Sequence, residues 1–182
     1  MSEAEFAAAC VLHHEAFAKE GRSLEAVLDK KRPVWMGDDV VPGPLRSVDA
    51  PLRYAVRDAS GRWLANAAVI RRRISTSAGP MVVLGLLDVA TLPAARGQGL
   101  GEVLVRAAMG PVDRGELPVC LFETGPAKGF YERLGARVIA NEVVNSTAED
   151  PQAPGFHDEF AMIYPGDADW PSGPIDLLGP GY

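Results

Sequence analysis

The chain has 182 residues, 47% of them hydrophobic and 23% charged, and a formal net charge of -6. This size and composition predict a single globular domain, residues 1–182, with a core of its own. The negative charge argues against nucleic acid and anionic membranes as partners, since both bind basic surfaces, and favours a cationic small molecule. Its apolar runs are too short to span a bilayer and its acidic start is unlike a signal peptide, so we expect a cytoplasmic protein.

The two cysteines, Cys10 and Cys120, lie far apart and have no CxxC or histidine-spaced neighbour. Neither a disulfide framework nor a metal site is therefore expected. Both cysteines are predicted to be small buried residues. The oligomeric state is left open, with a homodimer among the alternatives.

The first 51 residues predict two helices and a loop. The capping box Ser2-Glu-Ala-Glu5 begins a helix that ends before Gly21, with apolar or aromatic residues at helical spacing. That spacing is carried by Phe6, Cys10, His13 and Phe17. Ser23 is predicted to cap a short second helix through Leu28, which Pro33 ends. A loop carrying Trp35, Asp38 and Asp39 is expected from Pro33 to Pro51.

Three strands are predicted next. Leu52–Asp58 and Arg62–Ile74 are rich in strand-forming residues and flank the turn sequence of residues 58–61, so they form a hairpin. Met81–Thr91 is the third strand. Its nearly continuous apolar run indicates burial on both faces.

The remaining elements alternate between helix and strand. Gly99–Met109 and Ala127–Leu134 are predicted helices, and Val119–Glu123 is a strand between them. Val138–Val144 and Glu159–Tyr164 form a final strand pair, and a Pro/Gly-rich tail follows Pro165. This order predicts an α/β fold with a mixed, mostly antiparallel central sheet, flanking helices and one parallel strand-helix-strand unit.

A glycine-rich turn, Arg96-Gly-Gln-Gly-Leu-Gly101, joins the third strand to a helix. Such a junction presents free backbone N–H groups at the positive end of a helix, where a diphosphate can bind. The spacing fits neither a Walker loop, which ends in Gly-Lys-Ser/Thr, nor a Rossmann loop, which needs glycine at the position of Glu102. The alternative is an ordinary tight turn.

A second motif, Phe130-Tyr-Glu-Arg-Leu-Gly135, lies on the helix after the next strand. The two motifs, in this order and spacing, resemble the Arg/Gln-x-x-Gly-x-Gly/Ala and Phe-Tyr-Glu-Lys-x-Gly-Phe signatures of the GNAT superfamily of N-acetyltransferases. The resemblance covers roughly residues 52–164. Two departures are Ala136, where the family usually has an aromatic residue, and Thr124–Pro126, where many members carry an asparagine.

The resemblance implies the GNAT fold, with acetyl-CoA bound between two splayed strands. It assigns the pantetheine arm to the backbone of Val89, Ala90 and Thr91. It assigns the diphosphate to the turn formed by Arg96, Gly97, Gln98, Gly99, Leu100 and Gly101. It also places Tyr131 opposite the thioester sulfur and the Val89 N–H at the developing oxyanion.

The chemistry of acetyl transfer suggests further candidates. An alkyl amine is only about one part in a thousand unprotonated at neutral pH, which costs roughly 4 kcal/mol, so a base is needed. Asp88 is the first candidate and Glu123 the second; solvated residues or structural ion pairs are the alternatives. Tyr131 is the candidate acid for the departing thiolate, and core packing is its alternative. Arg71–Arg73 are expected to be solvated, and contact with the outer phosphate of the cofactor is their alternative.

The expected acceptor is a primary amine on a cationic small molecule such as an aminosugar or a polyamine. No Lys or Arg follows Arg137, whereas acids crowd this last segment. We expect an acidic entrance built from some of Glu149, Asp150, Asp158, Asp169 and Asp176, with Tyr182 also binding the substrate. The chain also resembles, loosely, the aminoglycoside 2'-N-acetyltransferases, although Leu87 replaces an acid there. The alternatives are a noncatalytic acyl-CoA-binding module and a protein N-terminal or lysine acetyltransferase.

Overall fold

The computed structural model describes residues 2–17, 21–35, 51–150 and 153–182. The chain divides into two compact units. The first consists of Met1–Pro44, Pro51–Ala68 and Asp88–Ala108, and the second of Leu45–Ala50, Val69–Leu87 and Met109–Tyr182. The long strands β2 (Trp63–Thr76) and β3 (Gly79–Thr91) contribute to both. That residues 1–182 form a single domain stays a prediction. Asp38 and Asp39, which were predicted to lie in a loop, are outside the described residues.

The first unit begins with helix α1, Glu3–Ala16, and the predicted capping box is confirmed. The Ser2 hydroxyl accepts a hydrogen bond from the Glu5 N–H at 3.3 Å, and the Glu5 carboxylate accepts one from the Ser2 N–H at 3.1 Å. The helix buries one face, which consists of Phe6, Ala9, Cys10 and Leu12. Phe17, expected on that face, is instead the C-terminal capping residue and is 37% exposed.

Helix α2, Leu24–Trp35, is longer than predicted. The Ser23 cap is confirmed, because its hydroxyl accepts a hydrogen bond from the Ala26 N–H at 3.2 Å. The predicted end at Leu28 and Pro33 is wrong. Contacts with α1 support the extra turn: the Arg32 guanidinium donates to Glu3 at 2.8 Å and lies 4.8 Å from the centre of the Phe6 ring. A proline removes one helical hydrogen bond, a loss that such tertiary contacts can offset.

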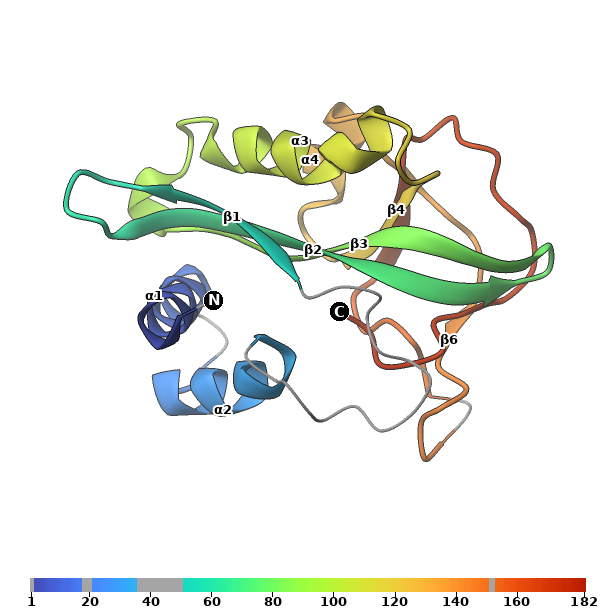
Figure 1. The fold of residues 1–182 in the computed structure, drawn as a ribbon, viewed down its shortest axis with the longest axis horizontal. Coiled ribbons are helices and arrows are strands. Elements are labelled where there is room, and N and C mark those ends of the chain that lie inside the picture. The colour runs from blue at the N-terminus through green and yellow to red at the C-terminus, as the bar shows by residue number, and fades with distance from the viewer. Residues whose placement is uncertain (1, 18–20, 36–50, 151–152) are drawn as a thin grey trace. The chain divides into compact units, whose positions relative to one another are not determined.

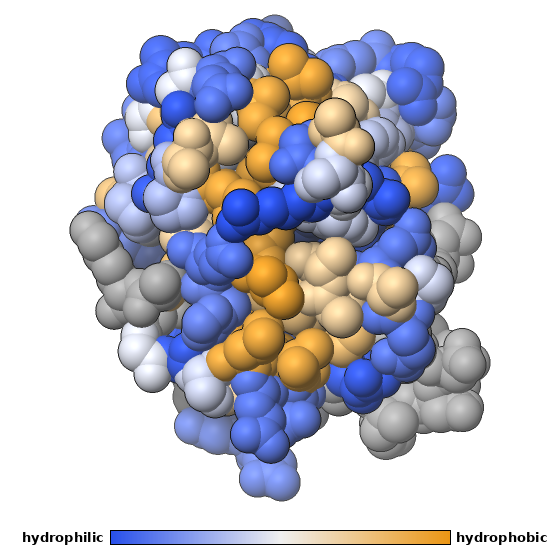
Figure 2. Space-filling model, turned by 90° about the vertical axis from the view of Figure 1, so that its left-hand side faces the viewer, coloured by the Kyte–Doolittle hydropathy of each residue, from blue (hydrophilic) through white to orange (hydrophobic). Residues whose placement is uncertain are grey.

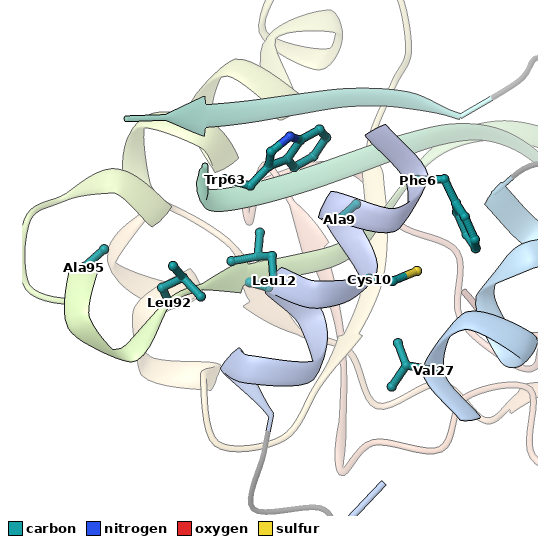
Figure 3. Close-up of a cluster of buried hydrophobic side chains, with 9 residues drawn as sticks. Phe6, Ala9, Cys10, Leu12, Val27, Trp63, Leu92 and Ala95 are labelled. Atoms are coloured by element: carbon teal, nitrogen blue, oxygen red, sulfur yellow. The ribbon is translucent and has the colours of Figure 1, made fainter. Parts of the chain in front are cut away.

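Strand β1, Leu52–Arg57, and the start of β2 form the predicted hairpin. The Asp58 carboxylate stabilises its turn by accepting hydrogen bonds from the N–H groups of Ser60 and Arg62, at 2.8 and 3.0 Å. Helices α1 and α2 lie on one face of the hairpin, and the start of α3 (Leu100–Asp113) lies on the other (Figure 1). The core of this unit fills the space beneath the strands (Figure 3) and consists of Phe6, Ala9, Cys10, Leu12, Val27, Trp63, Ala90, Leu92 and Ala95.

The second unit contains most of the sheet. Its strands are β4 (Cys120–Thr124), β5 (Arg137–Val138), β6 (Val143–Val144), β7 (Phe160–Tyr164) and β8 (Ile175–Asp176), with parts of β2 and β3. The strand order is β5-β7-β4-β3-β2-β8-β6. Strand β4 runs parallel to β3, with Leu84 opposite Cys120, and antiparallel to β7. The mixed sheet and the parallel strand-helix-strand unit are therefore as predicted, and Val83–Leu87 of β3 are buried.

Two differences concern the end of the chain. The strand predicted at Val138–Val144 is two short strands, because β5 pairs with β7 whereas β6 pairs with β8. The predicted tail contains β8, which pairs with β2 through Ser75 and Asp176. The β2–β8 contact joins residues 101 positions apart, and the β5–β7 and β6–β8 contacts join residues 24 to 32 positions apart, so local periodicity could not indicate them.

The last residues of the sequence pack into the second unit. The ring of Tyr182 covers Gly85 so closely that a Cβ there would lie 2.6 Å from it. Its hydroxyl donates to the Leu121 carbonyl at 2.9 Å. The prediction that Arg72 is solvated is wrong: it is 8% exposed, donates to the carbonyls of Leu177 and Pro180, and lies 5.1 Å from the centre of the Tyr182 ring. Burial lowers the pKa of this guanidinium.

Both cysteines are free and fully buried, as predicted. Burial raises the pKa of Cys10 to about 11 and raises that of Cys120 further, so neither is a reactive thiolate near neutral pH. In the part of the chain that the structure describes, no helix has the length and apolar character needed to cross a membrane.

Candidate active site

The glycine-rich turn lies in the first unit, between β3 and α3. A short 3-10 helix, Pro93–Ala95, leads into it, and α3 begins at Leu100. Gly97 and Gly99 have φ angles of 78° and 77°, which other residues rarely adopt, and a Cβ on either would meet no atom within 4 Å. Gly99, the residue before α3, has no side chain that could cap the helix. The open backbone therefore fits an anionic ligand at the first N–H groups of α3.

Arg96 packs against the start of this turn. Its guanidinium donates hydrogen bonds to the Ala16 carbonyl at 2.9 Å and to the Thr91 carbonyl at 3.3 Å. Ala16 is the last residue of α1, where a cation is favoured by the helix dipole. In this structure Arg96 thus ties the turn to α1, and its exposed side chain remains a candidate for the diphosphate.

The residues expected to bind pantetheine follow an interruption of β3. Asp88 has a φ angle of 54°, in the left-handed region, and its carbonyl accepts a hydrogen bond from the Asn66 side-chain amide at 2.8 Å. Beyond it, Ala90 is buried in the core of the first unit, whereas Val89 and Thr91 are partly exposed. The end of β3 therefore alternates between core and surface.

The carboxylate of Asp88 is buried and lies between two cations. One oxygen accepts from the Lys31 ammonium of α2, and the other accepts from the Arg53 guanidinium of β1 at 3.2 Å. Only 3% of the Asp88 side chain and 9% of the Arg53 side chain are exposed. Lys31, Arg53 and Asn66 were not predicted as part of the site. The one sequence signal was an amide, Asn66, inside the otherwise apolar run of residues 63–70.

In the second unit, Tyr131 lies on α4, Lys128–Arg133. Its ring contacts those of Phe122 and Phe130, at centroid distances of 4.7 and 5.0 Å, and the residue is 6% exposed. Burial raises the pKa of the Tyr131 hydroxyl, and Cys120 and Asp158 add smaller contributions in the same direction. The hydroxyl is therefore protonated throughout the neutral range, as a proton donor requires.

Glu123, at the end of β4, supports the loop that carries Asp158. One of its carboxylate oxygens accepts hydrogen bonds from the backbone N–H groups of His157 and Asp158, the second at 2.7 Å. Asp158 itself is exposed and contributes to the raised pKa of Tyr131. Glu123, Asp158 and Tyr131 are thus neighbours within the second unit.

Two of the predicted substrate-binding residues have structural contacts. The Asp176 carboxylate accepts hydrogen bonds from the N–H groups of Ser146 and Leu178, at 3.0 and 2.9 Å. Burial alone would raise the pKa of Asp176, but these bonds outweigh it and lower the pKa. Tyr182 packs on Gly85, as described above. Exposed acids of the last segment are Glu142, Glu149, Asp150, Asp158, Glu159, Asp167 and Asp169.

Among the described residues, no group of three His, Cys, Asp or Glu side chains could hold a metal ion.

Comparison with solved structures shows a common fold. A GNAT family acetyltransferase from Brucella melitensis, solved with acetyl-CoA, is 16% identical, with a TM-score of 0.60 over 96% of this chain and 90% of that one. A GNAT family N-acetyltransferase from Escherichia coli, solved with CoA, is 13% identical, with a TM-score of 0.60 over 100% of this chain and 92% of that one. The GNAT fold expected from the sequence is thereby confirmed.

A third similar structure is larger than this chain. It is a probable N-acyltransferase from Enterococcus faecalis V583, 12% identical with a TM-score of 0.55, and the alignment covers 75% of this chain but 31% of that one. No curated protein matches the chain.

The family model described as "Acetyltransferase (GNAT) domain" matches residues 54–135. The matched segment runs from β1 through the glycine-rich turn to the end of the Tyr131 motif at Gly135. Residues 54–135 are thus similar to a GNAT acetyltransferase domain, and the likeness to the solved structures shows that the chain has the GNAT fold.

Proposed function

We propose that the protein transfers an acetyl group from acetyl-CoA to a primary amine on a cationic small molecule. The observation that carries this proposal is the turn at Gly97 and Gly99, whose open backbone precedes the first N–H groups of α3. A helix start without a capping side chain is suited to bind a diphosphate. The similarity of residues 54–135 to a GNAT domain supports the reaction class.

In this proposal the first unit binds the donor. The backbone of Val89, Ala90 and Thr91 holds the pantetheine arm, and residues 96–101 hold the diphosphate. Figure 2 shows one face of the molecule, on which hydrophobic side chains gather with hydrophilic ones around and across them.

The second unit supplies the groups that act on protons. Tyr131 gives its hydroxyl proton to the departing thiolate. The Val89 N–H, which belongs to the first unit, stabilises the developing oxyanion. Glu123 is the better candidate to accept the amine proton, because its recorded hydrogen bonds among the described residues fall on a single oxygen. Both oxygens of Asp88 accept bonds from cations. Asp158, exposed beside Tyr131, attracts the ammonium form of the acceptor.

The test is release of the CoA thiol from acetyl-CoA across a panel of amines. The panel contains a polyamine, aminoglycosides with a free 2'-amine, a neutral amine, an anionic amino acid, and peptides with a free N-terminus or lysine. We expect the highest kcat/KM with a polycation. Acetyl-CoA binding without thiol release for any amine would favour a noncatalytic module, and a preference for peptides would favour a protein acetyltransferase.

Salt should weaken binding of the acceptor. The exposed acids of the last segment raise the local concentration of a cation, and this attraction is screened over about 10 Å at 0.1 M salt. We therefore expect KM for the best amine to increase several-fold between low salt and about 0.5 M, and to increase in Asp158→Asn at low salt. Steady-state kinetics at constant pH measures both effects.

The matched control for this prediction is Asp29→Asn. It changes the net charge by the same amount at an exposed position of α2, outside the acidic segment, and should leave KM unchanged. A KM that is independent of salt, or equal effects of the two variants, would contradict the acidic entrance but not acetyl transfer.

A further inference from the structure

Asp88 is unusual in its backbone as well as in its side chain. Its φ angle of 54° lies inside β3, a strand of otherwise extended residues. Among the described residues, Leu178 is the only other non-glycine residue with positive φ. Asparagine and aspartate tolerate this conformation better than other non-glycine residues, but it is still unfavourable. Such a conformation persists where surrounding contacts enforce it, and interruptions of this kind cluster near active sites.

The contacts around Asp88 come from three separate elements. Lys31 of α2 and Arg53 of β1 bind its two carboxylate oxygens, and the Asn66 amide of β2 binds its carbonyl. The Asn66 amide thus gives the Asp88 carbonyl a hydrogen-bond partner, as backbone polar groups away from water require. The Asn66 side-chain oxygen is buried and has no partner among the described residues, so this amide is oriented by its bond to Asp88.

These contacts determine the residues that follow. Val83–Leu87 are all buried. After Asp88, Ala90 is buried, whereas its neighbours Val89 and Thr91 are partly exposed. The change of pattern occurs at the residue with left-handed backbone. Asp88 therefore sets which backbone and side-chain groups of 89–91 reach the surface.

The same contacts make Asp88 unsuited to proton transfer. A general base must be able to accept a proton from the substrate on a free oxygen. Both oxygens here are hydrogen-bonded to cationic groups, and the side chain is 3% exposed.

We propose that Asp88 is a positioning residue: its ion pairs with Lys31 and Arg53 hold the left-handed interruption of β3 that presents residues 89–91 to the acetyl donor. The proposal rests on the proposed function in one respect, namely that residues 89–91 bind the donor. It replaces the general-base role that the sequence suggested for Asp88.

Substitution by asparagine and by alanine separates the two roles. Asparagine has the shape of aspartate and tolerates a positive φ angle, but it cannot act as a base. Alanine has no side chain for these contacts and does not tolerate a positive φ angle well. For a positioning residue, we expect Asp88→Asn, which loses both ion pairs, to raise the Kd of acetyl-CoA several-fold but to keep the acidic limb of the pH–kcat profile. We expect Asp88→Ala to raise the Kd of acetyl-CoA roughly tenfold.

Two measurements distinguish the outcomes. Calorimetry gives the Kd of acetyl-CoA without an acceptor, and pH–rate profiles give kcat with the best amine. Loss of kcat by roughly 10²-fold or more in Asp88→Asn at unchanged Kd, with loss of the acidic limb, would establish a base and overturn the proposal. An unchanged Kd in Asp88→Ala would also overturn it. Absence of acetyl-CoA binding by the unmodified protein would refute the proposed function instead.

A second variant guards against misfolding. Asp88→Asn leaves Lys31 and Arg53 without this carboxylate, which can destabilise the first unit. The double variant Lys31→Met/Asp88→Asn removes one of the two cations, and the Lys31 side chain is 19% exposed, so methionine fits its partly buried stem. A positioning role predicts that the double variant keeps the pH profile of the unmodified protein. A base role predicts a loss of kcat as large as in Asp88→Asn.

Discussion

We expect Tyr131→Phe to lower kcat by about 10²-fold or more while leaving the Kd of acetyl-CoA unchanged. Removal of a positioned general acid typically has an effect of this size. Phenylalanine keeps the ring contacts with Phe122 and Phe130, so the variant should fold normally. Calorimetry with acetyl-CoA and steady-state kinetics with a saturating amine measure the two quantities separately.

The control is Tyr164→Phe, which removes a tyrosine hydroxyl from the same unit. That hydroxyl donates to the Asp113 carboxylate at 2.5 Å, so its loss should affect stability and not kcat. The raised pKa of Tyr131 adds a second expectation: kcat should not decline between pH 8 and about 10, because the acid stays protonated there. An unaltered kcat in Tyr131→Phe, with chemistry shown to be rate-limiting, would leave Tyr131 a packing residue.

Much of the fold could be predicted because local signals and tertiary contacts agree. The Ser2–Glu5 capping box, the Asp58 turn and the continuous burial of β3 each follow from a few adjacent residues, and each is present. The errors occur where contacts with distant segments determine whether a helix continues or a strand forms. Helix α2 continues past Pro33 in contact with α1, and β8 forms because residues near 175 pair with β2 and β6.

In the candidate site too, features set by adjacent residues could be predicted, and features set by distant residues could not. The turn at Gly97 and Gly99 was predictable, since glycine spacing is a local property, and both residues have positive φ. The environment of Asp88 was not, because Lys31 and Arg53 lie 57 and 35 residues away and nothing in the sequence pairs them. The environment of Arg72 was not predictable for the same reason. Three arginines in a row indicated exposure to solvent, but the Arg72 guanidinium binds carbonyls that lie 105 and 108 residues away.

We expect Gly99→Asp to weaken binding of acetyl-CoA by roughly 10²-fold. A carboxylate placed beside the first N–H groups of α3 repels the diphosphate and competes for donors whose bonds to a charged group contribute about 1.5–3 kcal/mol each. Gly99→Asn has nearly the same shape without the charge, and should weaken binding less. Calorimetric titration with acetyl-CoA measures both affinities.

The matched control is Gly61→Asp, in the β1–β2 turn of the same unit. Gly61 has a φ angle of 85° and open space around its Cβ position, so this variant carries the same backbone strain and the same added charge as Gly99→Asp. It should bind acetyl-CoA as the unmodified protein does. If Gly99→Asp is folded and its affinity equals that of Gly61→Asp, the diphosphate does not bind at this turn, because a negative charge within the phosphate-binding backbone could not leave the affinity unchanged.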